Sequence, residues 1–71
     1  MIEVDARGLS CPIPVVKTIK AMEEHPQDVL QVLVDNGTAR ENILRLGTNR
    51  DYTVSVQETA GEWHLKLTPP A

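Results

Sequence analysis

Four short stretches of this chain alternate between apolar and polar residues, and this alternation constrains the fold more than any other feature. The stretches cover residues 2–6, 29–35, 52–57 and 63–67. A period of two is typical of a β-strand with one face toward a core and the other toward water. Leu33, on the outer face of the second stretch, breaks the pattern. We therefore predict four strands whose apolar side chains point to one side of a sheet.

A helical spacing of apolar residues separates the first two predicted strands. Pro12 and Pro14 fit the first turn of a helix, where an amide hydrogen has no intrahelical partner. The helix is expected to end before Pro26, because the residue preceding a proline disfavours the helical conformation. The spacing thus predicts a helix over residues 12–24, with an apolar face made by Val15, Val16, Ile19 and Met22.

A second helix is predicted between the second and third strands. Thr38 and Glu41 have the spacing of a capping box, in which each side chain bonds the backbone amide of the other residue. Gly47 stands where a helix would receive its C-terminal cap. The apolar stripe of this helix is expected to consist of Ala39, Ile43 and Leu46.

The resulting order of elements is β-α-β-α-β-β, with a turn at Ala60 and Gly61 between the last two strands. Because every strand has one apolar face, both helices are expected to cover the same side of the sheet. This predicts the α/β class, as an α+β two-layer sandwich. We expect one domain over residues 1–68, followed at 69–71 by a tail or the start of a linker, since prolines donate no ladder hydrogen bond.

The composition narrows the classes of function. Of the 71 residues, seven are basic and ten are acidic, giving a formal net charge of −3, and aromatic residues make up only 3%. Such a surface does not attract a phosphate backbone, and Tyr52 and Trp63 alone form no stacking platform for bases. We therefore expect no direct nucleic-acid partner. No apolar run is long enough to span a membrane, so we expect no membrane partner either.

The single cysteine sets further limits. It cannot form an internal disulfide, and the two histidines lack the spacing of a structural zinc site. We expect no metal or cofactor, and a monomer or weak homo-oligomer stabilised by packing. The first residues lack the basic and apolar segments of a secretory leader. Together with the free thiol, this favours the reducing cytoplasm.

Cys11 is the main candidate for chemistry. It lies where a loop meets the first predicted helix, and free amide groups and the helix dipole favour an anion there. Arg7 and Lys17 lie near it in sequence and add positive charge. A thiolate attacks sulfur electrophiles and can carry a persulfide, so this position suits sulfur transfer.

The prolines beside Cys11 limit the electrostatic effect. Pro12 and Pro14 have no amide hydrogen, which leaves mainly Ile13 and Val15 as donors at the helix start. We therefore expect only a modest lowering of the pKa of the thiol, with the prolines fixing the shape of the loop. The alternative is that Cys11 is a small buried side chain, as most free cysteines are. Its flanking residues favour the functional interpretation.

Other polar residues also have two interpretations. Asp5 either accepts hydrogen bonds in the turn around Gly8 or tunes the thiol, and the turn is preferred. Gly8 is expected to adopt a conformation closed to other residues. His64 is expected to be a solvated surface residue rather than a catalytic base. Three arginines either line one edge of the second helix as a docking patch or form a solvated face: Arg40, Arg45 and Arg50.

Residues 5–14 read DARGLSCPIP and resemble the TusA/SirA-like family, whose hallmark is D-x-x-G-L-x-C-P-x-P. The matching residues are Asp5, Gly8, Leu9, Cys11, Pro12 and Pro14. The length and the order of elements fit as well, so the resemblance covers nearly the whole chain. It implies a mixed four-stranded sheet with two helices on one face. It also implies that Cys11 accepts a persulfide sulfur from a cysteine desulfurase or a rhodanese-type donor and passes it to another protein.

A second segment is similar to one branch of that family. Residues 32–36 read VLVDN, and they are followed by Ala39, residues 41–43 and Arg45. This pattern resembles the YedF branch, which is linked to selenium metabolism and often carries a DsrE-like domain. The resemblance thus adds a DsrE-like protein to the expected recipients. Other recipients in the family belong to tRNA thiolation, molybdenum-cofactor and sulfur-oxidation pathways.

Two classes of function follow from these residues. The first is a sulfur carrier, a sulfurtransferase-type protein in which Cys11 relays a persulfide sulfur; whether this makes the chain an enzyme in its own right stays open. The second is a regulatory or selenium-related binding module, without catalysis, in which Cys11 is packed or merely redox-sensitive. The accessibility of the thiol discriminates between the two. A dithiol redox enzyme is disfavoured by the lone cysteine.

Overall fold

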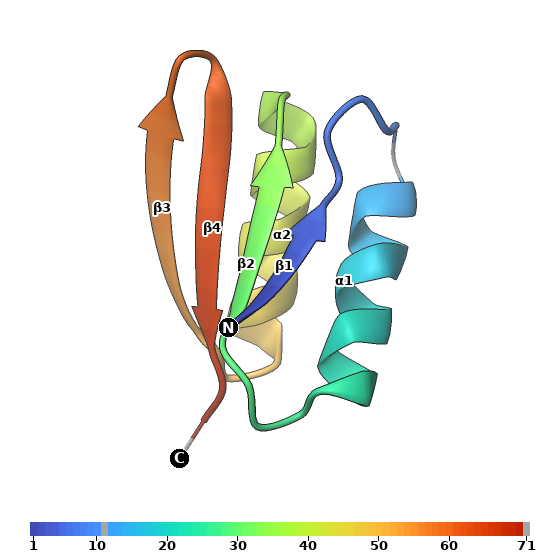
Figure 1. Cartoon of the computed structure of the whole chain (residues 1–71), viewed down its shortest axis with the longest axis vertical. Helices are drawn as coiled ribbons and strands as arrows, with labels where there is room; N and C mark the ends of the chain where they lie inside the picture. Colours follow the sequence, from blue (N-terminus) through green and yellow to red (C-terminus); the bar gives the residue numbers. More distant parts are fainter. Residues whose placement is uncertain (11, 71) are drawn as a thin grey trace.

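The computed structural model of the chain describes residues 1–10 and 12–70. Six elements follow one another in the predicted order (Figure 1). They are β1 (Ile2–Asp5), α1 (Ile13–Glu24), β2 (Leu30–Val34), α2 (Gly37–Asn49), β3 (Thr53–Thr59) and β4 (Glu62–Thr68). The predicted α/β fold, with two helices and a mixed four-stranded sheet, is confirmed.

The strands form one sheet in the order β1-β2-β4-β3. β1 and β2 run parallel, whereas β4 is antiparallel to both β2 and β3. The predicted turn at Ala60 and Gly61 joins β3 to β4, and both residues have positive φ angles, 52° and 80°. Positive φ at both central residues suits a two-residue hairpin, because the turn then matches the twist of the strands.

The core lies between the sheet and both helices. Register places apolar side chains of neighbouring strands in rows on one face, with Val4 beside Val32 and Val32 beside Leu65. The helices contribute residues such as Met22 and Ile43 to the same cluster. Since these strand and helix residues form one buried cluster, both helices cover the same face of the sheet. No helix in the described part of the chain has the length and hydropathy needed to cross a membrane.

The apolar face of α1 differs from the prediction at one residue. The helix begins at Ile13, with Pro12 as its N-cap residue. Val16, predicted to face the core, is instead 55% exposed. The inward position belongs to Thr18, which is buried and whose hydroxyl donates to the Pro14 carbonyl at 2.8 Å. That internal hydrogen bond satisfies the hydroxyl, so a polar side chain is tolerated there.

The ends of α2 also differ from the prediction. The N-cap residue is Asn36, whose side chain accepts from the Ala39 amide at 2.8 Å. The predicted capping box is therefore wrong, because Thr38 lies inside the helix and Glu41 pairs with Arg40. A cap at Gly47 is wrong too, since α2 continues to Asn49.

Gly47 allows α2 to approach the sheet closely. A Cβ atom at this position would lie 2.6 Å from Val54 Cγ2 and 3.3 Å from Leu67 Cδ2. Only a residue without a side chain fits this contact. The glycine therefore has a packing function where the sequence suggested a helix end.

Candidate functional site

The candidate site is the loop between β1 and α1, residues 7–12, which we call the cysteine loop. It lies at the upper end of the molecule in Figure 1, where both helices begin. Cys11 itself falls outside the described residues. The geometry of its neighbours is defined, however. Gly8 has a φ angle of +73°, the conformation expected for it from the sequence.

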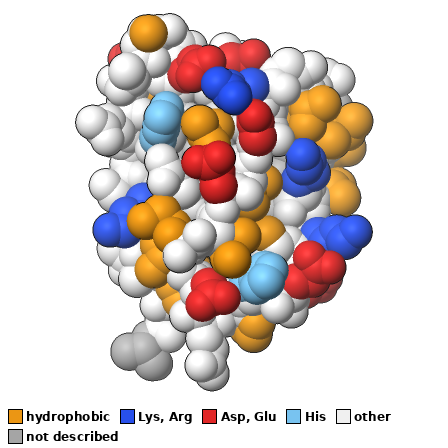
Figure 2. Space-filling model, viewed as in Figure 1, with side chains coloured by type: hydrophobic (Ala, Val, Ile, Leu, Met, Phe, Trp, Pro, Cys, Tyr) orange, Lys and Arg blue, Asp and Glu red, His pale blue; other side chains and the backbone are white. Residues whose placement is uncertain are grey.

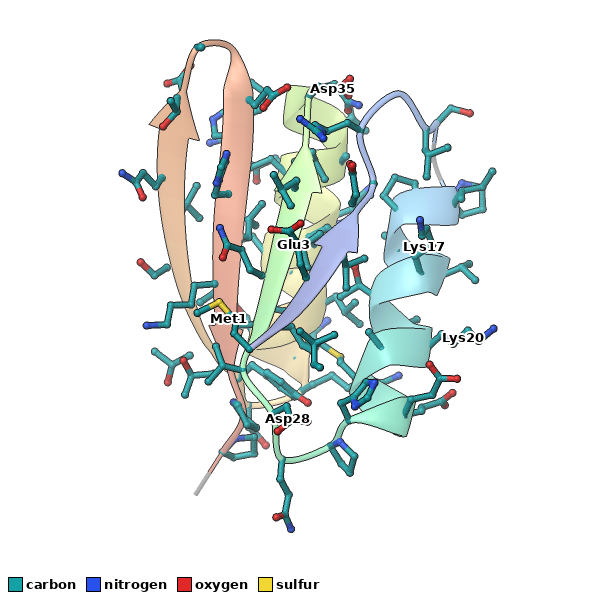
Figure 3. The ribbon with its side chains drawn as sticks, viewed as in Figure 1. Met1, Glu3, Lys17, Lys20, Asp28 and Asp35 are labelled. Carbon is teal, nitrogen blue, oxygen red and sulfur yellow. The ribbon has the colours of Figure 1, made fainter. Side chains whose placement is uncertain are left out.

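The carboxylate of Asp35 anchors the cysteine loop. Its Oδ2 atom accepts from the Gly8 amide at 2.9 Å, across 27 residues of sequence. Figure 3 shows Asp35 at the end of β2, beside the loop. The next residue, Asn36, caps α2. Two adjacent residues thus fix the loop and the second helix to the same end of the sheet.

Asp5 accepts hydrogen bonds in the turn around Gly8, as expected, and its donor is Arg7, the residue before Gly8. Its carboxylate accepts from Arg7 Nε at 2.9 Å, from Arg7 Nη2 at 2.8 Å and from the Arg7 amide at 3.2 Å. These hydrogen bonds, those of the side chain first, hold the pKa of the Asp5 carboxyl well below its usual range. They also raise the pKa of Arg7 above its ordinary value.

A second carboxylate shares the Arg7 guanidinium. Arg7 Nη1 lies 3.3 Å from Glu62 Oε2, at the start of β4. Figure 2 shows acidic side chains around a basic one at this upper end of the sheet. The charge of Arg7, expected from the sequence to favour a thiolate at Cys11, is therefore balanced by two carboxylates.

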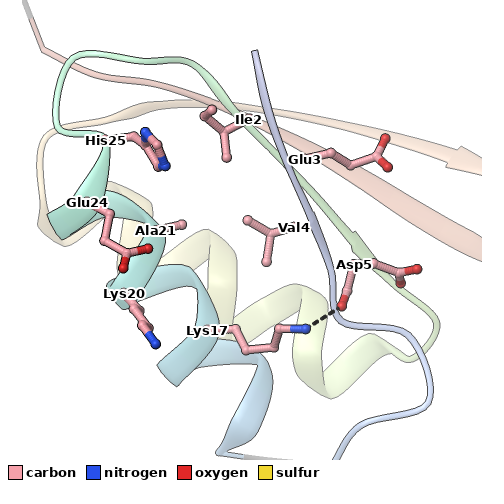
Figure 4. Close-up of a pocket in the computed structure, with 9 residues that line it drawn as sticks. All are labelled: Ile2, Glu3, Val4, Asp5, Lys17, Lys20, Ala21, Glu24 and His25. Atoms are coloured by element: carbon pink, nitrogen blue, oxygen red, sulfur yellow. Dashed lines mark hydrogen bonds between the residues drawn. The ribbon is translucent and has the colours of Figure 1, made fainter.

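Lys17 joins α1 to the end of β1. Its Nζ atom donates to the Asp5 carbonyl at 2.9 Å (Figure 4). This bond satisfies a backbone acceptor on β1, which is an edge strand of the sheet. Beside this bond, a groove between β1 and α1 has an apolar part that includes Val4 and Ala21. Because a carbonyl is a neutral partner, this bond does not balance the charge of Lys17.

Backbone amides at the start of α1 donate to carbonyl oxygens of residues nearby in the sequence. The Ile13 amide, one of the two donors expected to be available near the thiol, donates to the Ser10 carbonyl at 3.0 Å. The Val16 amide donates to the Pro12 carbonyl at 3.0 Å. Pro14 is fully buried, and Leu9 packs against the core. These two side chains therefore hold the cysteine loop against the body of the domain.

A second groove runs between α1 and α2 and begins at the cysteine loop. Its walls are formed by Pro12, Val15, Asn42, Arg45, Leu46 and Asn49. Arg45 is exposed and forms no ion pair with the residues that the structure describes. Close by on α1, Ile13 and Val16 are among the few exposed large apolar side chains in residues 1–10 and 12–70.

The three arginines of the second helix do not share one edge. Arg40 lies over the Trp63 ring, 5.5 Å from its centroid, and pairs with Glu41. Arg45 borders the groove between the helices, and Arg50 is the C-cap residue. A spacing of five residues turns the helix by roughly 140° between successive arginines, so a common face is excluded.

The histidines do not suggest a catalytic base. His64 lies 3.2 Å from Gln31 Nε2 through its Nδ1 atom, on the sheet face turned away from the helices. His25, the C-cap residue of α1, lies 3.5 Å from Asp28 Oδ2. Among the described residues, no three potential metal ligands gather in one place.

Comparison with known proteins identifies the family. Residues 2–68 match the family described as Sulfurtransferase TusA. The chain belongs to the TusA family. A relative from Methanocaldococcus jannaschii, named "Putative sulfur carrier protein MJ0990", is 44% identical over 59 residues, which cover 82% of this chain and 79% of that protein. The family and this relative support a role in carrying sulfur.

A solved structure supports the same family. The crystal structure of a SirA-like protein from Desulfitobacterium hafniense matches with a TM-score of 0.91 and 32% sequence identity, over 100% of both chains. The predicted membership of the TusA/SirA-like family is thus confirmed.

The sequence did not reveal the residues that contact the cysteine loop from distant parts of the chain. Asp35 and Glu62 contact the cysteine loop, but they lie 27 and 55 residues from their partners. No local pattern marks such pairs. Asn36 could have been found, because asparagine three residues before the Ala39 amide is a standard N-cap arrangement. The capping-box spacing of Thr38 and Glu41 pointed two residues too far along.

Proposed function

We propose that this chain is a sulfur carrier in which Cys11 cycles between a thiol and a persulfide. The observation that carries this proposal is the position of Cys11, the only cysteine of the chain, within the family's D-x-x-G-L-x-C-P-x-P segment. Family membership and the relative named as a sulfur carrier support it.

The relay needs two exchange steps at sulfur. The Cys11 thiolate attacks the outer sulfur of a donor persulfide, and the sulfur–sulfur bond of the donor breaks. The donor's inner sulfur leaves as a thiolate, and Cys11 becomes a persulfide. A recipient thiolate then attacks the outer sulfur on Cys11, which is released again as a thiolate. No electrons are gained or lost overall, so the carrier needs no oxidant or cofactor.

In this proposal the other motif residues determine the conformation of the cysteine loop. Gly8 supplies the positive φ angle, while Leu9 and Pro14 hold the loop against the core. Pro12 is the N-cap residue of α1. Asp5 holds Arg7, and Lys17 is the cation with an unbalanced charge next to this network.

We propose a cysteine desulfurase or a rhodanese-type protein as the donor and a sulfur-accepting protein, such as a DsrE-like protein, as the recipient. The lone cysteine suits a carrier, because no second thiol is present to displace sulfide by forming an internal disulfide. A free thiol with this task belongs in a reducing compartment, so we assign the relay to the cytoplasm. In this view the chain acts in sulfur transfer by carrying the sulfur as a covalent persulfide intermediate.

The first test is the intact mass of the protein after incubation with a cysteine desulfurase and cysteine. We expect the wild type to gain one sulfur atom that a reductant removes, and Cys11→Ser to gain none while keeping its fold by circular dichroism. A Cys11→Ser protein that still takes up sulfur would contradict the proposal. If the wild type gains no sulfur and a small alkylating reagent does not reach Cys11, the alternative of a binding module with a packed thiol takes its place.

A further inference from the structure

The two sides of the cysteine loop differ in polarity. On the side of the helices, Ile13 is 47% and Val16 is 55% exposed. These residues lie three positions apart in the first two turns of α1, so they neighbour each other on its surface. Exposed apolar side chains placed together next to a reactive residue are a common mark of a protein contact. Figure 2 shows apolar side chains over the start of α1, with basic ones beside them.

The two sides of the cysteine loop also differ in charge. The helix side carries Lys17, bonded only to a carbonyl, and Arg45, which has no ion pair within residues 1–10 and 12–70. The first turn of α1 contains no acidic residue. On the sheet side, Asp5 and Glu62 pair with the cation Arg7, and a third carboxylate, that of Asp35, accepts from the Gly8 amide.

We propose that the surface formed by Pro12, Ile13, Val16, Lys17 and Arg45, here named the helix-side surface, docks the protein that delivers sulfur to Cys11. This rests on the proposed carrier function. Transfer requires two sulfur atoms to come into contact, so the donor must cover the residues next to Cys11. The exposed valine and isoleucine are complementary to an apolar patch on the donor, and the cations are complementary to carboxylates around that patch. The sheet side, with its excess of carboxylates, repels such a donor surface.

The test compares loading from a protein donor with loading from a small molecule. The protein donor is a purified cysteine desulfurase supplied with cysteine. The small molecule is inorganic polysulfide, from which the Cys11 thiolate takes one sulfur and leaves the polysulfide one sulfur shorter. Val16→Asp and Arg45→Glu change the helix-side surface. Their matched controls are Val56→Asp, at a valine on β3 that is 40% exposed, and Lys66→Glu, at an exposed lysine on β4.

We expect Val16→Asp and Arg45→Glu to slow loading from the desulfurase by about tenfold or more, while polysulfide loads both variants like the wild type. Both controls should load at the wild-type rate from either source. Added salt should slow the wild type more steeply than Arg45→Glu, because the variant has lost an attractive charge.

Desulfurase rates of Val16→Asp and Arg45→Glu that equal the wild-type rate would overturn the docking surface and leave the carrier function standing. Equal slowing by the two controls would also overturn it, because the effect would then belong to any added negative charge. If the wild type takes sulfur from neither source, the carrier function fails and this inference fails with it.

Discussion

At the scale of single residues, the cysteine loop is held by three carboxylates, two of which come from distant parts of the chain. Asp35 accepts from the Gly8 amide, and Asp5 and Glu62 share the guanidinium of Arg7. These bonds fix the amide of Gly8 and the side chain of Arg7, beside the packing of Leu9 against the core. They also remove Arg7 as a source of free positive charge near Cys11.

The bond between Asp35 and Gly8 predicts a local effect on hydrogen exchange. Asp35→Ala removes the acceptor, so the Gly8 amide should exchange at least about tenfold faster, with a loss of roughly 1 kcal/mol or less in unfolding free energy. Amide exchange followed by NMR measures this. Asp28→Ala, which removes an exposed aspartate beside His25, is the matched control and should leave Gly8 protected. Unchanged protection in Asp35→Ala would show that another group holds the loop.

The pairing of Asp5 with Arg7 predicts a titration. Because the pKa of Asp5 lies below its unfolded value, the carboxylate stabilises the fold at pH values above that unfolded value. This contribution is lost as the pH falls from there through the folded-state pKa. Arg7→Gln should return the pKa to the ordinary aspartate range, whereas Glu62→Gln should leave it low. A carboxyl titration followed by NMR measures the pKa of Asp5 in each protein. An ordinary pKa of Asp5 in the wild type would refute its pairing with Arg7 in solution.

At the scale of the elements, α2 shows both what a sequence reveals and what it conceals. Its existence and buried stripe were predictable, since Ala39 and Ile43 follow helical spacing and are buried. Its limits were not, because a Thr-x-x-Glu spacing and a glycine can each stand at a helix end or inside a helix. Which case holds depends on contacts with the sheet, such as that of Gly47 with Val54.

The N-terminus of α2 can be tested by one pair of variants. Asn36→Ala should lower the unfolding free energy by about 1 kcal/mol, because it removes the acceptor of the Ala39 amide. Thr38→Ala should change it little, since Thr38 is an exposed residue within the helix. Urea unfolding measures both values. The reverse order would restore the capping box predicted from sequence.

The close contact of α2 with the sheet predicts the effect of filling it. Gly47→Ala should destabilise by about 1–3 kcal/mol although alanine favours helices, because the new methyl group meets Val54 and Leu67. Gly37→Ala, where an added Cβ meets no atom within 4 Å, is the control. In urea unfolding, the double variant Gly47→Ala with Val54→Ala should recover part of the loss. Additive losses would locate the strain elsewhere.

At the scale of the whole molecule, the parallel pairing of β1 and β2 brings the parts of the candidate site to one end of the sheet. The carboxyl ends of two parallel strands lie at the same edge of the sheet, and each strand is followed by a helix. Both helix starts and the cysteine loop therefore meet at one end (Figure 1). The order of elements, read from alternating and helical spacing, made this arrangement predictable. The bonds of Gly8 with Asp35 and of Arg7 with Glu62 were not, because they depend on side chains brought together only by the finished sheet.

The same geometry separates the cysteine loop from the end of the chain. The longest dimension of the molecule is 31 Å, and Figure 1 shows the loop at the top of this axis and the last residues at the bottom. A molecule anchored through its C-terminal end, to a sensor chip or to a second domain, would present the loop to the solution on its far side. Attachment at that end is thus compatible with access of large partners to the loop.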